Sequence, residues 1–188
     1  MSQGAFTIEA TPLAGLTVIG RIARGDSRGF FSRFFCDLAF AEAGIPFPVR
    51  QINHTLTHQA GAVRGLHFQH PPHAEDKFVS CLRGEVFDVA VDLRRGSPTF
   101  LRWHGERLSA ENRRSLLIPK GFAHGFQTLT TDCELLYLHS HPFAPDSEGA
   151  LQIADPQLKI DWPLPVSEIS DRDRSHAFLQ SDFTGIEV

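Results

Sequence analysis

The alternation of apolar and polar residues that marks a strand is longest in the middle of the chain. Between residues 86 and 93 the odd-numbered residues are all apolar, whereas the even-numbered side carries Asp88 and Asp92. We therefore predict a strand here with one buried face. Weaker alternation predicts further strands at residues 16–22, 78–82, 100–108, 115–118, 126–130 and 134–139.

Turn-forming residues separate these predicted strands. The turn signals are Arg-Gly at 83–84, Arg-Gly-Ser-Pro at 95–98, Pro-Lys-Gly at 119–121, and Pro142. Many short strands at this spacing leave little room for crossover helices. The pattern therefore favours an all-β fold, an antiparallel sandwich or barrel, over a parallel sheet.

Signals for helices are few. The best candidate is residues 37–43, where Asp37 can cap the start and Gly44 can end the helix. A shorter helical turn is expected at Ser170, because its hydroxyl and Asp173 three residues later form a pair like a capping box.

The composition indicates a globular chain and narrows its possible partners. The sequence has 188 residues, of which 41% are hydrophobic, and no apolar run approaches the roughly 18 residues of a membrane span. It contains no repeat and no linker, so we expect one domain over residues 1–188. The formal net charge of -4 gives no basic excess, and we expect no binding to nucleic acid or to membranes.

The N-terminal residues and the cysteines bear on where the protein works. The first ten residues contain neither the basic start nor the apolar core of a secretory signal, so we expect a cytoplasmic location. Cys36, Cys81 and Cys133 are odd in number and irregularly spaced, which fits reduced thiols better than a disulfide framework.

Histidine is frequent, with ten in the chain, so a metal site is the first possibility to test. His67, His70 and His73 are spaced by three, which would bring them to one face only in a helix. Pro71 and Pro72 prevent a helix there, and on a strand residues three apart point to opposite faces. The spacing of these histidines therefore predicts no shared metal site.

Seven segments carry a resemblance to a known family. They read DSRGFF at 26–31, QINH at 51–54, VRGLHFQ at 63–69, GEVFDVAVDLR at 84–94, SPTF at 97–100, IPKGFAHGF at 118–126 and SDRDR at 170–174. In this order and at these spacings they resemble the dTDP-4-dehydrorhamnose 3,5-epimerase family, whose members are metal-independent cupins acting on dTDP-4-keto-6-deoxyglucose. The segments together are far more specific than any single motif.

The resemblance implies a cupin jelly-roll fold, a nucleotide-sugar substrate linked to dTDP, no cofactor, and a homodimer in which N-terminal strands cross between subunits. Metal-binding cupins place a glutamate ligand about seven residues before a turn glycine. Counting back from Gly84, that position holds Lys77, a cation where a ligand would be needed. We therefore expect no metal.

The implied reaction inverts C3 and C5 of the sugar by proton transfer. Hydrogens beside a ketone are weakly acidic because their loss leaves an enolate, so inversion needs a base on one face of the sugar and an acid on the other. The resemblance implies that His67 is the base, oriented by Asp173, and that Tyr137, the only tyrosine in the chain, is the acid. It also implies that Lys77 meets the negative charge on the enolate oxygen.

The resemblance further implies residues that bind the substrate. A diphosphate needs several donors in a fixed geometry, which guanidinium groups supply. In the family, aromatic side chains enclose the nucleotide base, partly from a neighbouring subunit. The implied binding residues are Arg28 and Arg64 for the diphosphate, Gln51 and Asn53 as polar contacts, His124 beside the sugar, and Phe30 and Phe143 around the base.

The sequence departs from the family pattern near the implied acid. Arg33 stands where the family has a glutamate, Leu138 where it commonly has a lysine, and Pro142-Phe143 where it has paired tyrosines. The implied proton-transfer residues are intact. The loss of phenol groups beside Tyr137 opens the alternative of a 3-epimerase that stops after one carbon.

Plainer interpretations stand beside these roles. His67 could be an ordinary hydrogen-bonded histidine, Asp173 a helix cap, and Tyr137 a core residue. Four other histidines, His70, His73, His139 and His141, are expected at the rim or surface. The alternative functions are a metal-dependent cupin oxygenase or isomerase and a non-catalytic cupin that binds a nucleotide sugar.

Overall fold

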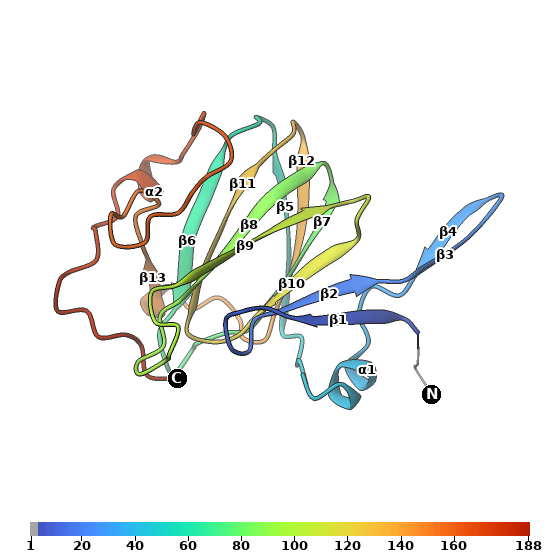
Figure 1. Ribbon diagram of the computed structural model, residues 1–188, viewed down its shortest axis with the longest axis horizontal. Helices are drawn as coiled ribbons and strands as arrows, with labels where there is room; N and C mark the ends of the chain where they lie inside the picture. Colours follow the sequence, from blue (N-terminus) through green and yellow to red (C-terminus); the bar gives the residue numbers. More distant parts are fainter. Residues whose placement is uncertain (1–3) are drawn as a thin grey trace.

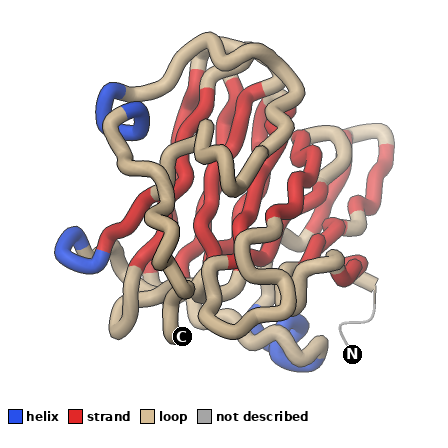
Figure 2. The backbone as a smooth tube through the Cα atoms, turned by 60° about the vertical axis from the view of Figure 1, so that its left-hand side comes forward, coloured by secondary structure: helices blue, strands red, loops and turns tan. Residues whose placement is uncertain are grey.

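Two antiparallel sheets face each other in the computed structural model, which describes residues 4–188 (Figure 1). The larger sheet has the order β1 (Phe6–Ala10), β2 (Thr17–Arg21), β10 (Arg114–Ile118), β7 (Lys77–Arg83), β12 (Cys133–His139) and β5 (Gln51–Thr57). The smaller sheet has the order β13 (Glu148–Ala150), β6 (Val63–Gln69), β11 (Phe122–Thr128), β8 (Glu85–Asp92) and β9 (Trp103–Ser109). The strands run side by side and loops gather at their ends (Figure 2). The prediction of an all-β antiparallel fold is confirmed.

The remaining elements are short. A hairpin of β3 (Ala23–Asp26) and β4 (Gly29–Ser32) projects away from the two sheets (Figure 1). The helices within residues 4–188 are α1 (Asp37–Glu42), α2 (Asp171–Arg174) and a short 3-10 turn, η1 (Pro145–Ser147). None of the helices within residues 4–188 has the length and apolar character that a membrane crossing requires.

All seven strands predicted from alternation are present, with shifted ends. The largest shift is in β11, which begins at Phe122 and not at residue 126. Six strands were not predicted from the sequence: β1, β3, β4, β5, β6 and β13. Strands β5 and β6 lack clean alternation, because β5 is exposed along most of its length and β6 is largely buried on both faces.

The strand predicted most strongly, β8, is buried on both faces, so the prediction of one buried face was wrong. Its odd-numbered side, with Val89 and Val91, packs against apolar residues of the C-terminal segment such as Leu151 and Leu158. Its even-numbered side faces the space between the sheets, and Asp88 there has no exposed surface. The alternation was real, but the C-terminal segment covers the face that would otherwise meet solvent.

The two helices differ in how they begin. At α1 the cap is Cys36 and not Asp37 as predicted, because Asp37 already has helical geometry and its carboxylate accepts from the amide of Leu38. At α2 the prediction is confirmed, since the Ser170 hydroxyl accepts a hydrogen bond from the amide of Asp173. This cap fixes the position of Asp173 beside β6.

Candidate active site

The two sheets enclose a cavity of about 650 Å3, which is lined by residues of β5, β6, β7, β11, β12 and the α2 segment. Its volume falls in the range of small-molecule sites, about 300–1,000 Å3. Eight of the eleven implied site residues line it: Asn53, Arg64, His67, Lys77, His124, Tyr137, Phe143 and Asp173.

Cross-strand pairing explains why these side chains meet in one cavity. Tyr137 and His139 lie two residues apart on β12, and His139 is paired with Lys77 of β7. Paired residues, and residues two apart on one strand, share a face of the sheet. In the smaller sheet His67 of β6 is paired with His124 of β11. The cavity therefore has two histidines on one wall and a tyrosine and a lysine on the other.

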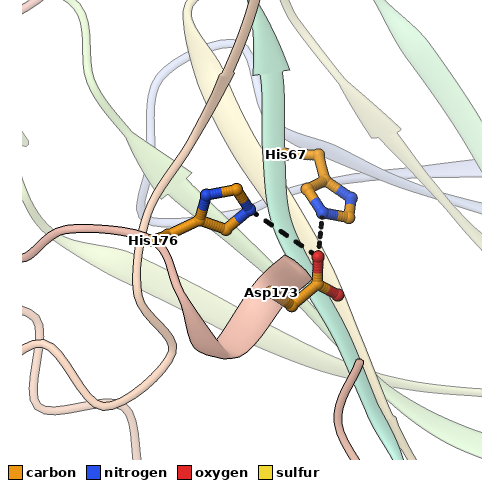
Figure 3. A group of neighbouring side chains, drawn as sticks. All are labelled: His67, Asp173 and His176. Carbon is orange, nitrogen blue, oxygen red and sulfur yellow. Dashed lines mark hydrogen bonds and ion pairs between the residues drawn. The ribbon is translucent and has the colours of Figure 1, made fainter. Parts of the chain in front are cut away.

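His67 and Asp173 form a hydrogen-bonded pair at the edge of β6 (Figure 3). His67 Nε2 lies 2.8 Å from Asp173 Oδ1, and the amide of Gly65 donates to the other carboxylate oxygen. Burial acts to raise the pKa of Asp173, but the hydrogen bonds from His67 and Gly65 outweigh it and hold this pKa below its usual value. Asp173 is therefore a buried anion, and it orients an imidazole whose side chain is 33% exposed.

Lys77 is buried and held by two acceptors. Its Nζ lies 3.1 Å from the carbonyl oxygen of His67 and 3.3 Å from Glu75 Oε1. The second Glu75 oxygen lies 2.9 Å from His139 Nδ1. Burial acts to raise the pKa of Glu75, but His139 and Lys77 together lower it below its usual value. The carboxylate of Glu75 thus holds the side chains of both Lys77 and His139 on this wall of the cavity.

Glu75 and His139 were not identified from the sequence as residues of the site. The prediction that His139 lies at the rim or surface was wrong, because its side chain is buried and lines the cavity. A signal was present, since His139 follows Tyr137 by two residues on a predicted strand and so shares its face. Glu75 precedes Lys77 by two residues but lies before the start of β7, where alternation gives no guidance.

Tyr137 lines the cavity and lies between two histidines. Its ring meets His124 edge-on at 5.9 Å and stacks on His139 at 6.2 Å. Burial raises the pKa of Tyr137 well above its usual value, and the nearby carboxylate of Asp88 raises it further. His124 Nε2 in turn lies 2.8 Å from Asp88 Oδ1. The phenol therefore keeps its proton across the neutral range.

The polar residues expected to contact substrate form part of the cavity wall. Arg64 Nε donates to the hydroxyl of Thr57 at 3.0 Å. Gln51 does not line the cavity itself, but it donates to Asn53 and accepts from the amide of Phe143. Gln51 therefore holds the start of β5 against the loop that carries Phe143 at the cavity mouth.

Arg28 and Phe30 lie outside this cavity, on the projecting β3–β4 hairpin (Figure 1). The Arg28 side chain is 86% exposed and pairs with Asp26 at 2.6 Å. Phe30 is 61% exposed. Within one chain the structure therefore does not bring these two residues to the other site residues.

One group of side chains within residues 4–188 has the composition and closeness that a metal ion needs. It consists of His67, Asp173 and His176, whose ligand atoms lie within 4.8 Å of one another (Figure 3). His176 was not identified from the sequence as part of any site.

Comparison with known proteins gives consistent similarities. The profile of the family described as dTDP-4-dehydrorhamnose 3,5-epimerase matches residues 10–181. A dTDP-4-dehydrorhamnose 3,5-epimerase from Pseudomonas aeruginosa is 50% identical over 161 residues, covering 84% of this chain and 88% of the relative.

Solved structures of relatives share the fold. The Bacillus anthracis dTDP-4-dehydrorhamnose 3,5-epimerase, solved with TDP and PPi bound, has a TM-score of 0.91 at 36% identity and covers 93% of this chain and 100% of that one. A Legionella pneumophila epimerase in complex with dTDP-4-keto-L-rhamnose has a TM-score of 0.85 at 43% identity, with 89% of each chain covered.

Proposed function

The chain belongs to the dTDP-4-dehydrorhamnose 3,5-epimerase family, and from this premise we propose that it inverts C3 and C5 of dTDP-4-keto-6-deoxyglucose. The resemblance seen in the sequence and the cupin jelly-roll prediction are both confirmed. The observation that carries the proposal is the placement of His67 and Tyr137 on two facing sheets around one cavity. That arrangement supplies a base and an acid to opposite faces of a sugar.

The proposed mechanism uses four side chains. The Nε2–H of His67 donates a hydrogen bond to Asp173, which leaves a lone pair on Nδ1. This lone pair removes the proton from the carbon beside the ketone. The electron pair of the broken C–H bond forms the enolate, and the Lys77 ammonium stabilises the charge on its oxygen. Tyr137 then gives a proton to the opposite face of the same carbon. Exchange with solvent restores both groups before the second carbon reacts.

We propose that the nucleotide end of the substrate lies toward the cavity mouth. Arg64 and Asn53 line the cavity and offer donors to a diphosphate, and the exposed ring of Phe143 offers a face to the base. Arg28 and Phe30 of the same chain lie too far out, on the hairpin, to join them.

Proton NMR of dTDP-4-keto-6-deoxyglucose in heavy water tests the activity directly. We expect deuterium at both C3 and C5, because every inversion returns a solvent-derived proton. Label at C3 alone would instead establish the 3-epimerase that the changed residues beside Tyr137 left open. No label at either carbon would refute the proposal and favour the non-catalytic binding protein.

We propose that the protein is a homodimer in which the β3–β4 hairpin of one subunit completes the site of the other. The hairpin stands clear of the sheets and exposes Phe30 and Phe31, at 61% and 71%. Contiguous exposed apolar surface marks sites of protein–protein contact. The partner hairpin would carry Arg28 and Phe30 to the cavity mouth.

Mixed dimers test whether the site is shared. Arg28→Ala and His67→Asn subunits should each be impaired alone, but their heterodimer should regain activity, because one of its two sites then has both residues intact. The matched control pairs Arg64→Ala with His67→Asn. Since Arg64 and His67 line the same cavity of one chain, that mixture should not recover. Recovery in neither mixture, or a monomer by light scattering, would refute the shared site.

A further inference from the structure

Two histidine nitrogens, from His67 and His176, approach one oxygen of the Asp173 carboxylate (Figure 3). His67 Nε2 lies 2.8 Å from Asp173 Oδ1, and His176 Nε2 lies 3.7 Å from the same oxygen on the other side. All three atoms fall within 4.8 Å of one another. The helix α2 and the loop after it bring Asp173 and His176 to β6, so the group is assembled from distant parts of the chain.

His176 has no other evident structural role in this position. Its Nε2 is buried and makes no hydrogen bond to any residue in the described part of the chain. The ring meets that of His67 edge-on, with 6.2 Å between the ring centroids. Buried polar atoms are nearly always paired, so an imidazole nitrogen left in this state and aimed at a carboxylate points to a ligand.

We propose that His67, Asp173 and His176 form a binding site for a divalent transition-metal ion, with Zn2+ as the best match. Zinc binds imidazole nitrogen and carboxylate oxygen at about 2.0–2.2 Å, which places tetrahedral ligand atoms about 3.3 Å apart. The separations of 2.8 and 3.7 Å to Asp173 lie on either side of that value. Calcium and magnesium prefer all-oxygen sites, so two imidazoles select against them.

The site has a free position and suitable donors. Three protein ligands leave one place in a tetrahedral shell, and the partly exposed His67 opens that place to the cavity. The carboxylate of Asp173 offers one oxygen donor and the two imidazoles offer nitrogen donors, which is a ligand set that Zn2+ takes.

Bound zinc would switch off the base. A neutral imidazole that ligates a metal through Nε2 carries its single proton on Nδ1, so His67 would lose the lone pair that the mechanism uses. The single imidazole proton of His67 moves from Nε2 to Nδ1 by exchange with solvent, and no redox step is involved. This inhibitory effect rests on the proposed epimerase function, whereas the metal site itself does not.

Metal binding can be measured without any substrate. We expect one Co2+ per chain with the visible absorption of a tetrahedral nitrogen and oxygen site, and one Zn2+ that displaces it. Replacing a residue that only hydrogen-bonds to a metal ligand lowers metal affinity by about 10- to 100-fold. Removing a ligand itself, in His176→Asn, should therefore lower the affinity at least ~10-fold. The matched control is His54→Asn, a histidine paired with a single carboxylate, Glu134, outside the cavity. His54→Asn should bind Co2+ and Zn2+ with the same affinity as the unchanged protein.

The heavy-water NMR assay then measures inhibition of the epimerase by Zn2+, and it needs no coupling enzyme. The unchanged protein and His54→Asn should lose activity as Zn2+ saturates the site and regain it with a chelator. His176→Asn should remain active at zinc concentrations at least ~10-fold higher. Equal metal affinity of His176→Asn and the unchanged protein, or no metal bound by either, would overturn the site. Metal binding without inhibition would overturn the inhibitory effect of zinc but leave the metal site.

Discussion

Replacing His67 with asparagine should lower kcat/KM for dTDP-4-keto-6-deoxyglucose by about 100- to 10,000-fold, the range that a positioned general base contributes. His67 lines the cavity, and its Nε2 is hydrogen-bonded to the buried carboxylate of Asp173. An asparagine side chain has no basic nitrogen, so proton abstraction at C3 and C5 should both fail. The rate of deuterium incorporation from heavy water measures this step directly.

The control for this prediction is the same substitution at His54. That residue lies on the exposed edge strand β5 and pairs with Glu134 at 3.2 Å, outside the cavity. Its replacement should leave exchange unchanged. The thermal unfolding of both variants shows whether each folds. A folded His67→Asn that still exchanges at the original rate would assign the base elsewhere, with His124 the next histidine on that wall.

The fold was predictable because local alternation and turn residues reflect the strand geometry itself. The segments that became β7, β10 and β12 each alternate, and Gly84 has the positive φ of 75° that its turn between β7 and β8 requires. The alternation within one strand cannot show that a distant segment of the chain covers its other face. The outer face of β8 is covered by Leu151 and Ile153, which lie some sixty residues further along the chain.

The site was predictable only in part, for a similar reason. The resemblance pointed to His67, Lys77, Tyr137 and Asp173, and the structure places all four around one cavity. The groups that hold them were missed because their contacts depend on strand register. Glu75 meets Lys77 and His139 only because β7 and β12 pair in the observed alignment. Register is a property of the assembled sheet and is not visible within one segment.

Replacing Tyr137 with phenylalanine should slow the formation of inverted product by about 100- to 1,000-fold, because it removes the proton donor and leaves the ring in place. Burial raises the pKa of this phenol well above its usual value, so in the unchanged protein it is protonated and ready to donate throughout the neutral range. His67 would still remove protons and could return them to the same face. Deuterium exchange with retained configuration should therefore fall much less than inversion.

That split between exchange and inversion identifies Tyr137 as the acid on the opposite face. Lys77→Met serves as the contrast, since loss of the ammonium near the enolate oxygen should slow exchange and inversion together. Phenylalanine keeps the edge-on contact with His124, so the thermal stability of Tyr137→Phe should change little. Equal loss of exchange and inversion in Tyr137→Phe would show that the phenol only positions its neighbours. In that case the proton on the far face must come from another donor on the same wall of the cavity.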